Sequence, residues 1–431
     1  MSTLLRLATA GSVDDGKSTL VGRLLHDTKS ILADQLDAVE RVSRERGLET
    51  ADLALLTDGL RAEREQGITI DVAYRYFATP NRSFVLADCP GHVQYTRNTV
   101  TGSSTADVIV LLVDARHGVL EQTRRHLAVA SLLRVPHVII AVNKIDLVGF
   151  AEDVFRGLEE RVREVVAGLG IPAVTVIPVS ALHGDNIAER SANTAWYSGP
   201  SLLELLEALP AGENPEDQPF RFPVQYVLRP QGAAVDPAYV EYRGYAGQVA
   251  SGIVRVGDEI AVLPTGRTAT VTGIDTADGE LDEAFAGQSV SLRLSDNIDL
   301  SRGDLIAAAQ AAPTPTREVE ALVCWLHERP LRAGDKVLLK HTTRTVRAIV
   351  KALDSRLDLD TLTGVPAESL GLNDIGRVHL KLADEVSAET YAESRQTGSF
   401  LLIDAQTGHT LAAGMIRNTV PQDLSATDWV I

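Results

Sequence analysis

The chain has 431 residues, which is too long for one ordinary domain and predicts two or three. Its 45% hydrophobic and 23% charged residues are typical of a globular protein, and its two cysteines argue against a disulfide framework. The net charge of −17 disfavours general affinity for nucleic acid, and no apolar run reaches the roughly 20 residues of a membrane span. We therefore expect a cytoplasmic protein that binds neither nucleic acid nor membrane.

Residues 1 to about 212 alternate apolar runs with amphipathic stretches. Short apolar runs predict strands that are buried on both faces, and they are Leu4–Ala8, Phe84–Ala87, Val108–Val113, Val138–Val142 and Val174–Val179. Apolar residues at three-to-four spacing predict helices over Lys17–Leu25, Thr123–Leu133 and Ala151–Leu169. This alternation predicts an α/β domain with a mostly parallel sheet. The charged residues 30–65 are interpreted as a helical insertion.

Two proline-rich joints, at residues 210–215 and 311–315, separate this part from two β-rich blocks. The first block has candidate strands over Phe222–Leu228, Ala246–Val254, Glu259–Leu263, Thr268–Ile274 and Ser289–Leu294. The second has them over Val319–Leu326, Lys336–Lys340, Thr345–Val350, Gly376–Leu382 and Ser399–Ile403. Such short strands between turn residues are typical of a small barrel or sandwich. We expect three domains, over residues 1–215, 216–313 and 314–431.

A phosphate-binding loop is predicted between the first strand and the first helix. The pattern G-x-x-x-x-G-K-[ST] is matched by Gly11, Ser12, Val13, Asp14, Asp15, Gly16, Lys17 and Ser18. Glycines let backbone N–H groups surround phosphates, and the helix N-terminus adds positive potential. Lys17 would reach the β- and γ-phosphates, and the Ser18 hydroxyl would ligate magnesium. A chance glycine-rich turn is the alternative, which the flanking strand and helix disfavour.

Further candidate site residues follow other predicted strands in chain order. Asp88, Cys89, Pro90 and Gly91 close one strand, where a carboxylate can hold magnesium through water and a glycine N–H can meet the γ-phosphate. Without the other motifs, this segment would be interpreted as an ordinary turn at the end of a strand. Cys89 is interpreted as a packing residue. Thr69 in the run Gly67–Asp71 is placed to ligate magnesium and sense the γ-phosphate.

Specificity for guanine is predicted from Asn143, Lys144 and Asp146. The carboxylate of Asp146 can accept two hydrogen bonds from guanine, which adenine cannot supply. Ser180 and Ala181 follow the next strand and can present backbone N–H groups to the guanine O6. Each of these motifs alone is weak evidence. The phosphate loop and the segments Asp88–Gly91, Asn143–Asp146 and Ser180–Ala181 follow successive predicted strands in order, and together they strongly predict a GTP-binding domain.

These motifs together resemble the translation-factor-type GTPases, the superfamily of elongation factor Tu and elongation factor 1α. The residues that carry the resemblance are Gly11–Thr19, Arg64–Ile70, Asp88–His92 and Asn143–Asp146. The resemblance implies a GTPase domain followed by two β-barrels, with GTP and magnesium as cofactors. It also implies that His92 orients the attacking water beside Lys17, Thr69 and Gly91, and that Thr19 and Leu182 join the nucleotide site.

Other stretches are similar to one branch, the GTPase subunits of bacterial ATP sulfurylase (sulfate adenylyltransferase). They are residues 53–67, 71–77, 94–98, 114–126, 196–204, 221–227, 243–247 and 283–287. This resemblance implies that GTP hydrolysis is coupled to adenylylsulfate synthesis from ATP and sulfate, in sulfate assimilation. The adenylyl transfer would occur on a separate small subunit, in a heterodimer or a larger assembly.

The phosphate loop departs from the usual translation-factor sequence. Ser12 and Asp15 match the sulfurylase branch, and two acidic residues in the loop would repel phosphate unless they point away or hold a cation. In relatives, the residue that matches Asp14 can help to bind a monovalent cation. The resemblance therefore leaves open a monovalent cation near Asp14 in this chain.

Two alternatives remain open for the client of the GTPase. One is a translation factor that delivers aminoacyl-tRNA, and the other is a stand-alone regulatory GTPase. Some sulfurylase relatives carry a C-terminal adenylylsulfate kinase. Because the sequence has a single phosphate-loop motif, we expect that activity to be absent from this chain unless a longer natural protein was truncated.

Overall fold

The computed structural model describes residues 4–45, 51–56, 71–210, 212, 214–233, 237 and 240–419. The chain divides into two compact units, of which the first holds residues 1–212 and the second most of residues 213–424. No helix within the described residues is both long and apolar enough to span a membrane.

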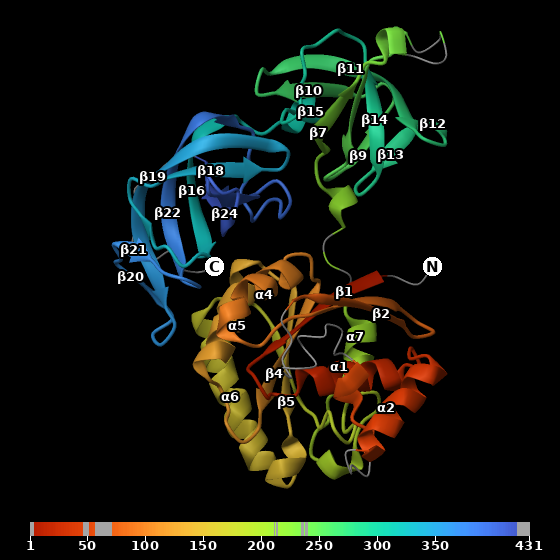
Figure 1. Ribbon diagram of the computed structural model, residues 1–431, viewed down its shortest axis with the longest axis vertical. Coiled ribbons are helices and arrows are strands. Elements are labelled where there is room, and N and C mark those ends of the chain that lie inside the picture. Colours follow the sequence, from red (N-terminus) through yellow and green to blue (C-terminus); the bar gives the residue numbers. More distant parts are fainter. Residues whose placement is uncertain are drawn as a thin grey trace. The chain divides into compact units, whose positions relative to one another are not determined.

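The first unit is built on a six-stranded sheet with the strand order β2-β3-β1-β4-β5-β6 (Figure 1). Its strands are β1 (Leu4–Gly11), β2 (Ala73–Ala78), β3 (Ser83–Asp88), β4 (Val108–Asp114), β5 (His137–Asn143) and β6 (Val174–Pro178). All neighbours are parallel except the edge strand β2, which is antiparallel to β3. The predicted mostly parallel sheet is therefore confirmed.

Helices cover both faces of this sheet. The helices of this unit are α1 (Lys17–Asp27), α2 (Ala33–Glu45), α4 (Thr96–Ser103), α5 (Glu121–Leu132), α6 (Glu152–Gly168) and α7 (Leu202–Ala208). The apolar side chains of α1 and α7 join one core with the sheet, and α4, α5 and α6 lie on the other face (Figure 1). Right-handed crossovers require this division, because β1 leads toward one edge of the sheet and the later strands lead toward the other.

The central strands are buried as their sequence predicts. Every residue of β4 is buried, which is why its sequence is a continuous apolar run. The expectation of burial on both faces is wrong for the beginning of β1, where Leu4 and Arg6 are exposed. The reason is that α4 covers only part of this face, and the edge strand β2 adds Tyr74 and Tyr76, which are 49% and 72% exposed.

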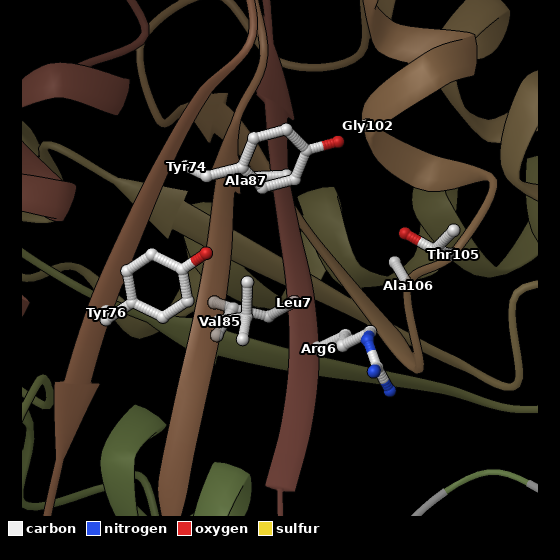
Figure 2. A pocket seen from close by; sticks show the side chains of 9 residues that line it. All are labelled: Arg6, Leu7, Tyr74, Tyr76, Val85, Ala87, Gly102, Thr105 and Ala106. Atoms are coloured by element: carbon white, nitrogen blue, oxygen red, sulfur yellow. The ribbon is translucent and has the colours of Figure 1, made fainter. Parts of the chain in front are cut away.

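A shallow hollow of about 420 Å³ lies on this open face, beside the end of α4 (Figure 2). Its lining consists of Arg6, Leu7, Tyr74, Tyr76, Val85, Ala87, Gly102, Thr105 and Ala106. None of these residues belongs to the nucleotide motifs.

The region interpreted as a helical insertion, residues 30–65, contains two helices within its described part. Helix α2 is followed by a short 3-10 helix over Leu53–Leu56. Residues 46–50 and 57–70 lie outside the described part, and with them Thr69.

The second unit contains two antiparallel barrels, so barrels rather than sandwiches are formed. The first barrel is a ring of β7 (Arg221–Leu228), β8 (Gly244–Gln248), β14 (Ser289–Leu294), β11 (Arg267–Thr276), β10 (Glu259–Leu263) and β15 (Leu305–Ala308). Pairing of β10 with β11 closes the ring. Short strands β9 (Ile253–Arg255), β12 (Gly279–Leu281) and β13 (Glu283–Phe285) decorate it.

The second barrel is closed in the same way, by pairing of β18 with β19. Its ring consists of β18 (Lys336–His341), β23 (Ser399–Ile403), β24 (Thr410–Asn418), β16 (Thr316–Trp325), β22 (Ile375–Val386) and β19 (Arg344–Asp358). The shorter strands are β17 (Leu331–Arg332), β20 (Thr363–Val365) and β21 (Ser369–Leu370). Each barrel has its own apolar core.

Candidate nucleotide-binding site

The candidate site lies where the carboxyl ends of the parallel strands meet the start of α1. The phosphate loop runs from the end of β1 to Lys17, which begins α1. Gly16 precedes the helix in the left-handed conformation, with φ of 91°. A Cβ at this position would lie 2.4 Å from Asn143 Nδ2, so only glycine fits between the loop and the end of β5.

Lys17 lies between the phosphate loop and the turn after β3. Its Nζ donates to the carbonyl oxygens of Gly11 and Ser12, each at 3.0 Å. Burial lowers the pKa of Lys17, an effect that the nearby Asp88 carboxylate opposes. A Cβ on Gly91 would lie 2.2 Å from Nζ. The predicted phosphate-binding lysine and the predicted γ-phosphate turn are therefore in direct proximity.

The two acidic residues of the loop have different environments. Asp15 is buried, and its Oδ2 accepts a hydrogen bond of 2.6 Å from the Ser12 N–H. Burial raises the pKa of Asp15. Asp14 is exposed and has φ of 67°. The buried Asp15 carboxylate thus stabilises the loop through its hydrogen bond with the Ser12 backbone.

Asp88 and Ser18 provide the oxygen ligands that magnesium prefers. Asp88 is buried at the end of β3, where the Thr9 hydroxyl donates to its Oδ1 at 2.9 Å. Ser18 is half-buried on the first turn of α1. In the described part of the chain, no three His, Cys, Asp or Glu side chains form a metal-binding group. A magnesium ion held also by phosphate oxygens and water needs no such group, so these residues fit it.

The guanine motif is attached directly to the phosphate loop. Asn143 Nδ2 donates to the Asp15 carbonyl oxygen at 2.7 Å, and Asn143 Oδ1 accepts from the Ala181 N–H at 2.9 Å. Lys144 Nζ donates to the Asp14 carbonyl oxygen. The predicted base-binding and phosphate-binding residues therefore form one connected structure.

Three residues that the sequence analysis did not select also hold this structure. Arg23 on α1 donates to the carbonyl oxygens of Ala181 and Leu182, and so fixes the loop after β6. Asp114 accepts hydrogen bonds from Arg116 and lies 3.0 Å from Lys144 Nζ. No motif spacing marks Arg23, whereas Asp114 had a signal, since it ends an apolar strand as Asp88 does.

Other predicted residues lie at the rim of the site or in the turn after β3. Asp146 is half-buried and lies 3.8 Å from His183 Nε2. Val13 and Leu182 are exposed, and Thr19 is half-buried.

The turn after β3 contains a buried thiol and a half-buried imidazole. Cys89 is buried, and burial raises its pKa, which agrees with a packing role. The Nδ1 of His92 accepts a hydrogen bond of 3.4 Å from the Gln94 N–H, so Nε2 is the nitrogen available to water. The position of Thr69 is not described.

Two family models match the chain. Residues 2–212 match the Elongation factor Tu GTP binding domain, and residues 318–417 match a model described as GTP-eEF1A C-terminal domain-like. A solved structure of Sup35 complexed with GMPPNP aligns over 98% of this chain and 95% of that one, at 24% identity. The TM-score of this alignment is 0.44.

Several relatives match over almost the whole chain. The bifunctional enzyme CysN/CysC of Mycobacterium tuberculosis is 53% identical over 97% of this chain and 68% of its own length. Sulfate adenylyltransferase subunit 1 of Bacteroides fragilis is 49% identical over 99% of this chain and 88% of that protein. Sulfate adenylyltransferase subunit 1 of Cellvibrio japonicus is 48% identical over 96% of this chain and 86% of that protein. Together with the match to the GTP-binding domain, this similarity shows that the chain belongs to the sulfate adenylyltransferase subunit 1 family of elongation factor Tu-type GTPases.

Proposed function

We propose that this chain is the GTP-hydrolysing subunit of a sulfate adenylyltransferase and couples GTP hydrolysis to adenylylsulfate synthesis on a separate subunit. The observation that carries the proposal is the 49% identity to sulfate adenylyltransferase subunit 1 over 88% of that protein. The phosphate loop joined to the guanine motif supports guanine nucleotide as the ligand.

The chemistry on this chain is attack of water on the γ-phosphate of GTP. Magnesium, held by Ser18 and through water by Asp88, would supply positive charge against the phosphates. Lys17 neutralises the charge that develops on the phosphate oxygens, and the Gly91 N–H binds the γ-phosphate. His92 orients the water. Thr69, outside the described residues, completes the metal ligands in this proposal.

The guanine base is bound by the residues after β5 and β6. Asp146 accepts two hydrogen bonds from the base, Asn143 and Lys144 support it, and Ser180, Ala181 and Leu182 form the loop at O6. The phosphates contact the segment from Gly11 to Thr19. A monovalent cation beside the exposed Asp14 would offset the negative charge of this loop.

Adenylyl transfer from ATP to sulfate forms an O–P bond to sulfate and releases pyrophosphate. The chain has a single phosphate-loop motif, and we assign that motif to GTP. A partner subunit therefore carries the ATP site, in a cytoplasmic heterodimer or larger assembly. The domains are proposed to be residues 1–215, 216–313 and 314–431.

The test is to purify this chain together with the adenylyltransferase subunit encoded in the same genome. Adenylylsulfate formation from ATP and sulfate is measured with GTP, with GDP and with the non-hydrolysable analogue GMPPNP. We expect a complex and more product with GTP than with either control. Absence of a complex and of GTP stimulation would refute the proposal, and tight binding of aminoacyl-tRNA would favour the translation alternative.

A further inference from the structure

We infer that Asp114, at the end of β4, is a positioning residue for guanine nucleotide: together with Arg116 it holds the Lys144 side chain in its nucleotide-binding geometry. The inference rests on the proposal that this site binds guanine nucleotides. Neither Asp114 nor Arg116 belongs to a nucleotide motif.

The first observation is the convergence of three chain segments on one ammonium group. Lys144 follows β5 in the left-handed conformation, with φ of 61°. Its Nζ lies 3.0 Å from Asp114 Oδ2 and also donates to the Asp14 carbonyl oxygen in the phosphate loop. The lysine therefore connects the ends of β4 and β5 to the phosphate loop, and Asp114 is its charged anchor.

The second observation is the way in which the anchor itself is held. Asp114 is only 2% exposed, and its Oδ1 accepts from the Arg116 backbone N–H at 2.9 Å and from Nε at 3.0 Å. Its Oδ2 accepts from Arg116 Nη2 at 2.7 Å. This two-pronged contact with a planar guanidinium leaves the carboxylate one orientation, in which Oδ2 also faces Lys144.

The charge of the anchor is constant over the physiological pH range. Burial raises the pKa of Asp114, but the hydrogen bonds from Arg116 and Lys144 outweigh burial, and the pKa lies well below its usual value. The neighbouring His117 Nδ1 is 3.7 Å from Oδ2, and Asp15 is the nearby like charge. Asp114 is thus a permanent countercharge for Lys144.

The consequence for binding is preorganisation. A free lysine side chain populates many rotamers, and ordering it when the nucleotide binds would weaken affinity. Asp114 and the Asp14 carbonyl oxygen order the Lys144 side chain when the protein folds. Nucleotide binding therefore does not have to reduce the conformational entropy of this side chain. The phosphate loop benefits as well, since Lys144 and Asn143 both bond its carbonyl oxygens.

The central experiment is the substitution Asp114→Asn, which keeps the shape of the side chain and removes its charge. Binding of N-methylanthraniloyl-GDP and -GTP is measured by fluorescence, with dissociation rates from chase experiments. We expect Kd to rise about 10-fold, mainly through faster dissociation, since hydrogen bonds between charged groups are worth about that factor. In turnover assays the change should fall on KM more than on kcat.

Two further variants separate positioning from a general loss of structure. In a Lys144→Met background, Asp114→Asn should have almost no additional effect if it acts through Lys144. Arg116→Gln removes a partly exposed side chain, and should raise Kd by a smaller factor while the fold is kept. Asp114→Glu, which restores the charge, should recover part of the affinity.

The matched control is Glu152→Gln, which breaks an acid–arginine pair with Arg156 on the exposed face of α6 and should leave Kd unchanged. Asp146→Asn tests the underlying proposal, because it should shift base preference from guanine toward xanthine. If Asp146→Asn leaves base preference unchanged, the proposed site is wrong. If it shifts preference while Asp114→Asn does not weaken binding, or weakens it equally without Lys144, only the inference about Asp114 is overturned.

Discussion

Asp15 shows how an acidic residue can be accommodated in a phosphate-binding loop. Its carboxylate accepts the Ser12 N–H at 2.6 Å and is buried behind the loop, while Asn143 binds its carbonyl oxygen. Asp14 is exposed, with its carbonyl bound by Lys144. Asp15 therefore supports the loop through both its carboxylate and its carbonyl oxygen, and Asp14 supports it through its carbonyl oxygen.

At His92 we predict that substitution by alanine slows single-turnover GTP hydrolysis by about 10²-fold or more while Kd for GTP stays within about threefold. The reason is that a residue orienting water contributes to the transition state and not to nucleotide binding. Quench-flow or phosphate-release assays measure the rate. His409→Ala, at an exposed position of the second barrel, is the control. Loss of GTP binding in His92→Ala would show that its role is assigned wrongly.

Buried His126 on α5 makes the first unit sensitive to acid. Burial lowers its pKa to about 3, so below the unfolded value of about 6.5 the unfolded chain binds a proton that the folded chain does not. The stabilisation is complete above pH 6.5 and is lost as pH falls toward 3. Between pH 7.5 and 5.0 this linkage amounts to about 2 kcal/mol.

We therefore predict that His126→Gln removes about 2 kcal/mol of the stability loss between pH 7.5 and 5.0. Hydrogen-exchange mass spectrometry of the β4 peptide, without nucleotide, measures the free energy of opening at both pH values. His183→Gln, at an exposed imidazole, is the control and should leave the pH dependence unchanged. An identical pH dependence in wild type and His126→Gln would contradict the prediction.

At the scale of single elements, two helical glycines should respond to alanine in opposite ways. A Cβ at Gly157 in α6 would meet no atom within 4 Å, whereas at Gly22 in α1 it would lie 2.1 Å from the Leu53 carbonyl oxygen. Alanine is favoured over glycine in a helix by about 1 kcal/mol. Gly157→Ala should therefore raise the thermal midpoint by about 2 to 4 °C, and Gly22→Ala should lower it. A higher midpoint in both variants would contradict the close contact at Gly22.

Strands that are continuous apolar runs, or that are bounded by turn residues, could be predicted from the sequence. β4 and β5 contain the continuous apolar runs Val108–Val113 and Val138–Val142 because helices cover both of their faces. β10 and β23 match the predicted ranges in full. The prediction joined β8 and β9 into one strand, but Gly252 adopts φ of 73° and breaks the run. Closure of the barrels depends on pairings between strands, which periodicity along one strand does not encode.

The distinction between local sequence patterns and contacts formed only in the folded chain also holds in the nucleotide site. Residues of the phosphate loop and the guanine motif have fixed spacing, because several backbone groups must reach one ligand. Arg23, Asp114 and Arg116 act only once α1 and the ends of β4, β5 and β6 are together. Arg23 and Ala181 are distant in sequence, and so are Asp114 and Lys144. No local pattern marks Arg23 or Arg116, whereas Asp114 could be noticed only because it ends an apolar strand.

On the scale of the whole molecule, an ion pair between a buried arginine and a half-buried glutamate joins the two barrels within the second unit. Arg221 in β7 donates through Nη2 to Glu389 Oε1 at 2.8 Å and through Nε to Oε2 at 3.0 Å. The Thr397 hydroxyl also donates to Oε2, and Arg221 donates to the Ala311 carbonyl oxygen at 2.6 Å. The carboxylate is thus satisfied from both barrels.

We predict that Arg221→Ala lowers the free energy of unfolding of this unit by about 3 kcal/mol, because it removes a buried guanidinium and leaves the half-buried Glu389 carboxylate without its charged partner. Arg255→Ala, which breaks the exposed pair with Glu283, should cost less than about 1 kcal/mol. Urea titrations of the full chain measure both. The double variant Arg221→Met with Glu389→Leu should recover much of the loss. Equal costs for the buried and the exposed pair would contradict the prediction.

The burial of both cysteines, Cys89 and Cys324, also has a practical consequence. Thiols that are buried and protonated do not react with maleimides in the native protein. A fluorescent dye can therefore be attached to a single introduced cysteine without removing the native ones. A pair of dyes at exposed positions such as Asp153 and Arg267 would report, by energy transfer, whether the first unit and the barrels change their separation as GTP is turned over.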